Sequence, residues 1–202
     1  NILRDCLTNS LIFLRNQELI QVRHLVPTVL AVLAISTIAC TSTENEKFNK
    51  ITPSEQIFSI EDFKAIRFKI NTEYDVSKLP SASSAWFGFW TPEGTVAKEY
   101  ELRFYRSHED AIKHGTSYAV EGSGDTALLD EEDAKWDEGL KDRRAFFAGQ
   151  VGTHGSGSVQ PLYGGYATYG NIILLCEGEN ESQALDYCAA LMNAVDPQSR
   201  VH

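Results

Sequence analysis

The sequence predicts an α+β fold in two layers, a mainly antiparallel sheet with helices packed on one face. Three observations lead to this prediction. Residues 85–105 read as an antiparallel hairpin, residues 164–178 read as a second strand pair, and an amphipathic helix follows Asn180. Strands and helices do not alternate regularly, so a doubly wound parallel sheet is not expected.

The folded part is expected to begin near Phe58 with a short helix. Ser59 followed three residues later by Asp62 is typical of a helix start. The apolar residues behind it keep helical spacing, and they are Ile60, Phe63, Ile66 and Ile70.

The first hairpin joins residues 85–91 and 97–105 through the turn at residues 92–94. Its second strand alternates apolar and charged side chains. The apolar set is Tyr100, Leu102 and Phe104, and the charged set is Glu99, Glu101 and Arg103. We therefore expect this strand to bury one face and to leave its charges in solvent.

Two helices are expected after the hairpin. Ser107, with Asp110 at the third position, caps the first.

The second, more polar helix is predicted over residues 130–147. It begins with four acidic residues and ends with Lys141, Arg143 and Arg144, so its charges would complement the helix dipole at both ends. The acidic run lacks the ligand spacing of a calcium loop, which favours a solvated helix over a cation site.

The last helix brings two cysteines into reach of each other. Asn180 with Gln183 caps it, and Cys188 lies on its apolar side. Cys176 ends the strand that precedes the helix, and a strand commonly packs on the helix that follows. In an oxidising compartment we expect a disulfide between Cys176 and Cys188; two buried free thiols are the alternative.

Residues 23–40, RHLVPTVLAVLAISTIAC, suggest an oxidising compartment. Basic residues precede an apolar run that is too short to span a membrane, and small or polar residues lead into Cys40. The pattern resembles a bacterial lipoprotein signal. This resemblance implies that Cys40 carries lipid and that the chain is exported and membrane-anchored, on the periplasmic or extracellular face.

The expected organisation follows from that signal. Residues 1–39 form the leader, 41–57 a flexible tether, and 58–202 a single globular domain. The chain holds one methionine, Met192. Residues 1–21 therefore either lengthen the leader or lie upstream of a non-standard start at Val22.

The net charge of −10 excludes some partners. Nucleic acid requires a basic surface, so no nucleic-acid partner is expected. The predicted partners are the membrane, through the lipid on Cys40, and an envelope protein or small ligand.

We predict no cofactor and no metal, because His108 and His114 lie six residues apart and point about 120° away from each other on one helix.

Catalytic patterns are sparse. His154 lies in a glycine-rich loop beside Ser156 and Ser158, which raises the hypothesis of a small exported hydrolase. The G-x-S-x-G nucleophile motif is absent from the sequence. A surface loop without catalytic function explains the same composition.

Aromatic residues give the other hypothesis. A groove between the hairpin and the glycine-rich loop would suit a sugar, a peptide or a partner protein. Its expected lining is Trp86, Trp90, Tyr163, Tyr166 and Tyr169. We therefore predict a non-enzymatic, envelope-anchored binding protein, with the hydrolase as the alternative.

Overall fold

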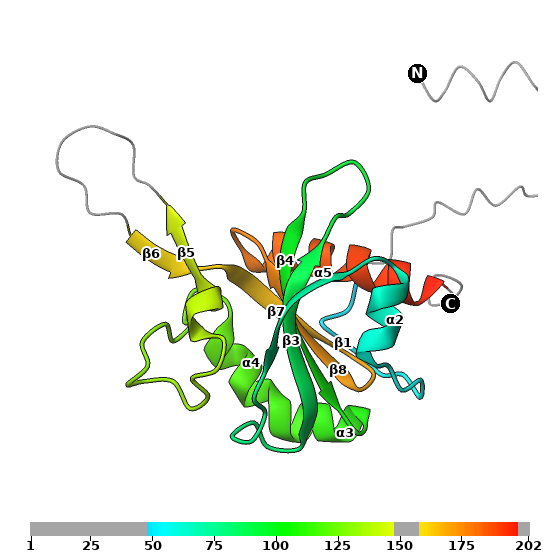
Figure 1. Ribbon diagram of the computed structural model, residues 1–202, viewed down its shortest axis with the longest axis horizontal. Coiled ribbons are helices and arrows are strands. Elements are labelled where there is room, and N and C mark those ends of the chain that lie inside the picture. The colour runs from blue at the N-terminus through cyan, green and yellow to red at the C-terminus, as the bar shows by residue number, and fades with distance from the viewer. Residues whose placement is uncertain (1–47, 148–157, 198–202) are drawn as a thin grey trace, which may run out of the picture. The chain divides into compact units, whose positions relative to one another are not determined.

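The computed structural model describes residues 48–147 and 158–197, which lie within one compact unit that spans Asn45–His202 (Figure 1). Its centre is a six-stranded sheet with the order β1-β7-β8-β4-β3-β2. Neighbouring strands are antiparallel except for β1 and β7, which are parallel. The strands are β1 (Ile51–Thr52), β2 (Lys69–Tyr74), β3 (Ala82–Trp90), β4 (Lys98–Tyr105), β7 (Tyr163–Tyr169) and β8 (Ile172–Glu177).

A separate two-stranded ribbon is formed by β5 (Arg144–Phe147) and β6 (Ser158–Pro161), and it extends away from the sheet (Figure 1). The helical segments are α2 (Ile60–Ala65), α3 (His108–Asp110), the π-helical turn Ala111–Gly115, α4 (Thr116–Gly122), the 3-10 turn Leu140–Arg143 and α5 (Glu181–Val195). The predicted α+β class with a mainly antiparallel sheet is confirmed.

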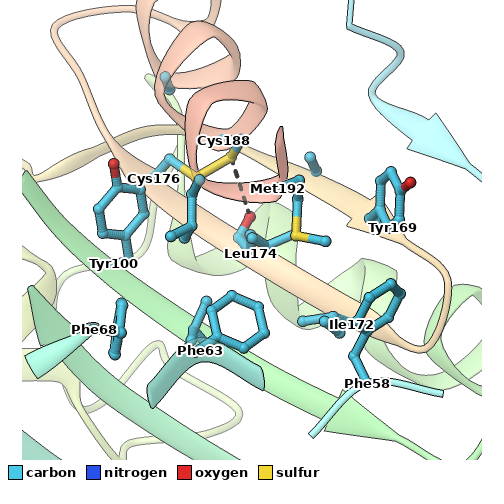
Figure 2. Close-up of a cluster of buried hydrophobic side chains, with 14 of the residues drawn as sticks. Phe58, Phe63, Phe68, Tyr100, Tyr169, Ile172, Leu174, Cys176, Cys188 and Met192 are labelled. Carbon is cyan, nitrogen blue, oxygen red and sulfur yellow. Dashed lines mark hydrogen bonds between the residues drawn. A yellow bond between two sulfur atoms is a disulfide. The ribbon is translucent and has the colours of Figure 1, made fainter. Parts of the chain in front are cut away.

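The main core fills the space between one face of the sheet, α2 and α5. Phe63 is fully buried and meets Phe68 and Phe104 edge to face, with ring centroids 6.0 and 5.7 Å apart. Figure 2 shows Phe63 beneath the residues of α5 and β8. The predicted disulfide between Cys176 and Cys188 is present, with Cα atoms 5.8 Å apart, and it joins β8 to α5. Asn180 caps α5 as expected, accepting a hydrogen bond from the backbone N–H of Gln183.

Helices also cover the opposite face of the sheet, although the sequence predicted helices on one face only. Tyr105, Ile173 and Leu175 pack there against Ala111 and Ala119 of the α3–α4 segment. The reason lies in β8, whose run IILL is apolar at every position and is buried on both faces. Such a continuous apolar strand needs a layer on each side.

The predicted helix over residues 130–147 is wrong. The chain instead forms turns, the 3-10 segment and strand β5. Trp136 lies in the middle of this stretch and is completely buried, with its indole Nε1 donating to the backbone O of Asp75 at 3.1 Å. Long-range anchoring of this side chain replaces the helical hydrogen bonds that the charge pattern suggested.

Part of the predicted tether packs on the domain. Residues 51–52 form β1 beside β7, and the ring of Phe48 stacks on Tyr169 with centroids 6.4 Å apart. The ring contact of Phe48 and the pairing of β1 with the edge of β7 hold this segment on the domain. The leader, Cys40 and residues 41–47 lie outside the described residues.

Candidate functional site

A pocket of about 430 Å³ lies at one end of the sheet. Six parts of the fold meet there: the start of β4, the loop after α4, the base of the β5–β6 ribbon, the start of β7, the end of β8 and the first turn of α5. The lining residues are Lys98, Gly124, Asp125, Ala145, Gln160, Pro161, Leu162, Gly164, Glu177, Gly178, Glu179 and Gln183. Its volume lies within the range of small-molecule sites.

Glycines keep the floor of this pocket open. A Cβ on Gly164 would lie 2.5 Å from the backbone O of Gly178, so no side chain is possible there. Gly124 has φ +77°, a conformation that favours glycine, and its N–H donates to the backbone O of Tyr163 at 2.9 Å. The two glycines let the α4 loop and β7 run close together without filling the space above them.

An ion pair forms one wall. The Lys98 ammonium donates to Glu177 at 2.7 Å, and only 15% and 25% of the two side chains are exposed. This hydrogen bond raises the pKa of Lys98. The backbone N–H of Glu99 donates to the second Glu177 oxygen at 2.9 Å, and the Lys98 ammonium also lies 4.9 Å from the centre of the Tyr187 ring. The ion pair in this wall is therefore formed before any ligand binds.

A smaller cavity of about 260 Å³ adjoins the pocket and shares Gly124, Asp125 and Gly164 with it. Its own lining includes Lys50, Tyr166 and Glu181. The two cavities adjoin at these three residues, Asp125 among them, and together they are called the two-lobed site.

Buried charges lie on the same face of the sheet as α4. The Glu101 carboxylate, which is completely buried, accepts hydrogen bonds from Arg103 Nε at 2.6 Å and from Arg143 Nε at 3.1 Å. Burial opposes ionisation of Glu101, but Arg103 and Arg143 outweigh it and lower the pKa of the carboxyl group. Both guanidinium groups lie 4.9 Å from the Trp136 ring.

This buried cluster holds the base of the ribbon beside the pocket. The backbone O of Arg143 accepts a hydrogen bond from the N–H of Leu162 at 2.8 Å, while the side chain of Arg143 reaches Glu101 in the centre of the sheet. Arg144 donates to the backbone O of Leu129. The pocket wall formed by Ala145, Gln160 and Pro161 therefore depends on charges that lie behind it.

The aromatic residues expected to line a groove do not come together. Trp86 and Trp90 pack on the α2 side of the sheet, where Trp90 Nε1 donates to the backbone O of Ile66 at 3.1 Å. Tyr169 belongs to that same core and is buried. Tyr163 and Tyr166 lie on the opposite face, Tyr163 completely buried. The prediction failed because alternation assigns residues to two faces but does not say whether a layer covers each face.

The other predicted residues have mixed outcomes. His154 and Ser156 lie outside the described residues, and of Ser158 only the backbone, in β6, is described. His108 Nδ1 contacts the backbone O of Gly170 at 2.9 Å, while His114 Nε2 lies 3.9 Å from Asp110. Within the part of the chain that the structure describes, no group of three or more metal-ligating side chains occurs.

The sequence pattern did not predict the two-lobed site, because its charged residues come from distant segments. The short-range signals that remained were glycines beside acidic residues, in Gly124-Asp125 and Glu177-Gly178-Glu179. Such pairs are also ordinary turn composition.

Comparison with known proteins places the described domain in a family. The model of a family of unknown function, DUF6810, matches residues 59–197. The chain belongs to this family. No curated protein and no solved structure matches it significantly. The matched stretch runs from the start of α2 to the end of α5, so the larger cavity and the disulfide lie within it. Over residues 48–147 and 158–197, no helix has the length and apolar character to cross a membrane.

Proposed function

We propose that this member of the DUF6810 family is an envelope-anchored lipoprotein that binds a small polar ligand without transforming it. The resemblance of residues 23–40 to a lipoprotein signal supports the anchor. The observation that carries the binding function is the preformed pocket of about 430 Å³ between the ribbon base, β8 and α5.

The chemistry of the pocket favours binding over catalysis. Its titratable lining residues are Lys98 and three acids, Asp125, Glu177 and Glu179. Lys98 and Glu177 form an ion pair. Each side chain is therefore held by the other and is not available to act on a substrate as an acid or a base. Paired charges of this kind orient a polar ligand at little cost in reorganisation.

Two measurements test the proposal. Membrane fractionation with intact-mass analysis of the wild type and of Cys40→Ser tests the anchor. Lipid mass on the membrane-bound wild type, and its loss from the variant, is the expected result. Soluble protein without lipid would overturn the anchor and leave the pocket unaffected.

The pocket is tested by filling it. Ala145→Phe adds a ring to the wall, whereas Ala65→Phe places the same ring on the exposed side of α2. Amide NMR spectra of the full chain with lysine, cadaverine, glucose, glutamate and glutarate should show a ligand that shifts Gly124 and Gly164. Ala145→Phe should weaken that ligand about tenfold or more. Equal affinity of both variants, or no shift with any of the five compounds, would overturn the binding function.

The hydrolase based on His154 and Ser156 or Ser158 stays a prediction, since the described residues do not include that histidine. Loss of a measured hydrolytic activity in His154→Ala would support it.

A further inference from the structure

Two lysines of the chain occupy matching sites along the two-lobed pocket. In the smaller lobe the Lys50 ammonium lies 4.3 Å from the centre of the Tyr166 ring and is paired with Glu181. In the larger lobe the Lys98 ammonium lies beside the Tyr187 ring and is paired with Glu177. Each site combines an aromatic face with a carboxylate, which is the combination that binds organic ammonium groups.

The two sites differ in how firmly they hold their lysine. The Lys98 and Glu177 side chains are mostly buried, so their pair is shielded from water and resists exchange. The Lys50 and Glu181 side chains are 39% and 57% exposed. Exposed pairs contribute little net free energy, so a competing ammonium group can displace Lys50 at small cost.

The charge balance of the site favours a cation. Across both lobes, four carboxylates (Asp125, Glu177, Glu179 and Glu181) face two lysines, which gives a net charge of −2. Both lysines are already neutralised by their partners. Asp125 has no ion pair within the described residues, and it stands at the junction of the lobes.

We propose that the pocket binds an aliphatic diamine or polyamine, and that Lys50 occupies the place of one ligand ammonium in the free protein. That ammonium lies on the Tyr166 ring beside Glu181, and the chain of the ligand passes Asp125 into the larger lobe. The inference rests on the proposed binding function and names its ligand class. It assigns Lys50 as a competitor of the ligand and Asp125 as a ligand contact.

Cadaverine and glutarate provide a matched pair of probes, because both have a five-carbon chain and they carry ammonium or carboxylate ends. Titration calorimetry and amide NMR on the full chain should show that cadaverine binds and shifts Gly124 and Gly164, while glutarate does not. Binding of glutarate or of another probe without cadaverine would overturn the diamine ligand and leave the binding function intact. If none of the tested compounds binds, both proposals fail.

Variants give the sharper test because the expected signs are opposite. Lys50→Met removes the competing ammonium and should tighten cadaverine about two- to tenfold, the equivalent of one exposed ion pair with its ring contact. Asp125→Asn should weaken it by a similar factor. Lys64→Met removes an exposed lysine that is paired with Glu61 on α2, far from the pocket lining, and serves as the control.

A Lys50→Met variant with unchanged or weaker cadaverine affinity would overturn the competition. An unchanged affinity in Asp125→Asn would overturn the assigned contact. Asp125 is an exposed turn residue, and Lys50 is half-buried beside β1. The folded state of each variant is checked by its unaltered amide spectrum outside the site.

Discussion

Strand β4 has opposite chemistry on its two faces. Tyr100, Leu102 and Phe104 join the apolar core beneath α5, which the Cys176–Cys188 disulfide closes. Glu101 and Arg103 point to the other face and are equally buried. One face thus excludes water with hydrocarbon, and the other excludes water from charges that must satisfy one another.

The two faces of β4 are expected to lose stability in different ways when a side chain is removed. An apolar core loses free energy in proportion to the contacts removed, and neighbouring side chains relax around the gap. A buried ionic cluster loses much more stability when one member is removed, because its partners stay charged and are shielded from water. Among the described residues, both terminal nitrogens of Arg103 lack a hydrogen-bond partner, so the cluster has no second acceptor to replace the Glu101 carboxylate for Arg103.

The largest effect is expected for Glu101→Gln. It leaves two buried guanidinium groups without their shared carboxylate, and the free energy of unfolding should fall by about 3–5 kcal/mol. Glu99→Gln, two positions away on the same strand, is the matched control. Burial, followed by the nearby Glu177, raises the pKa of Glu99, so neutralising it should not destabilise the protein. Urea denaturation measures both, and a loss below about 1 kcal/mol for Glu101→Gln would contradict the role of the cluster.

Breaking the disulfide should cost less. In Cys176→Ala/Cys188→Ala the loop between the two positions gains freedom in the unfolded chain, and stability should fall by roughly 2–3 kcal/mol. The fold should persist, since Phe63, Leu191 and Met192 still bury the α5 face. Thermal unfolding of the oxidised wild type and the variant compares them. A variant that fails to fold would show that losing the disulfide destabilises the protein more than losing the Glu101 charge.

Acid should destabilise the charged face selectively. The pKa of Glu101 is lower in the folded state than the ordinary value of 4.5, so its stabilising contribution is complete above pH 4.5 and is lost as pH falls through the folded-state pKa. The difference in stability between wild type and Glu101→Gln should therefore be constant above pH 4.5 and shrink below it. A difference that stays constant down to pH 2 would exclude Glu101 as its source.

The smallest effect is expected at the start of α5. Asn180→Ala removes the side-chain oxygen that accepts from the N–H of Gln183, and the cost should be about 1 kcal/mol. Ser182→Ala, in the same turn and exposed, is the control. Equal stability of the two variants in urea would show that packing on β7 and β8 alone fixes this helix end.

Local signals in the sequence predicted much of the fold. The caps at Ser59, Ser107 and Asn180 mark helix starts that the structure confirms. The turn at Gly170 joins β7 to β8, the two strands of the second predicted pair, and φ at this glycine is +52°. These features depend on residues within one turn of each other, so the sequence pattern contains the whole interaction.

The charged face and the pocket could not be predicted in the same way. Glu101 and Arg143 are 42 positions apart, and their pairing turns a strand position that looks solvated into a buried one. In place of the predicted helix over residues 130–147, the chain forms turns, a 3-10 segment and β5, anchored by the burial of Trp136 and Arg143. The period-two alternation of side chains distinguishes the two faces of β4, but it does not predict which elements pack on each face.

By itself the sequence determined the α+β class, the main hairpins and the last helix, since each follows from short-range spacing and apolar periodicity. It also predicted that Cys176 and Cys188 lie within reach of each other, and the structure shows the disulfide. Only the tertiary structure decided that helices cover both faces, that Glu101 lies between two arginines, and that Lys50 and Lys98 flank one pocket. Those outcomes depend on the joint burial of side chains from distant segments. The free energy of burying a charge is set by the partner it meets, and that partner is fixed only when the chain has folded.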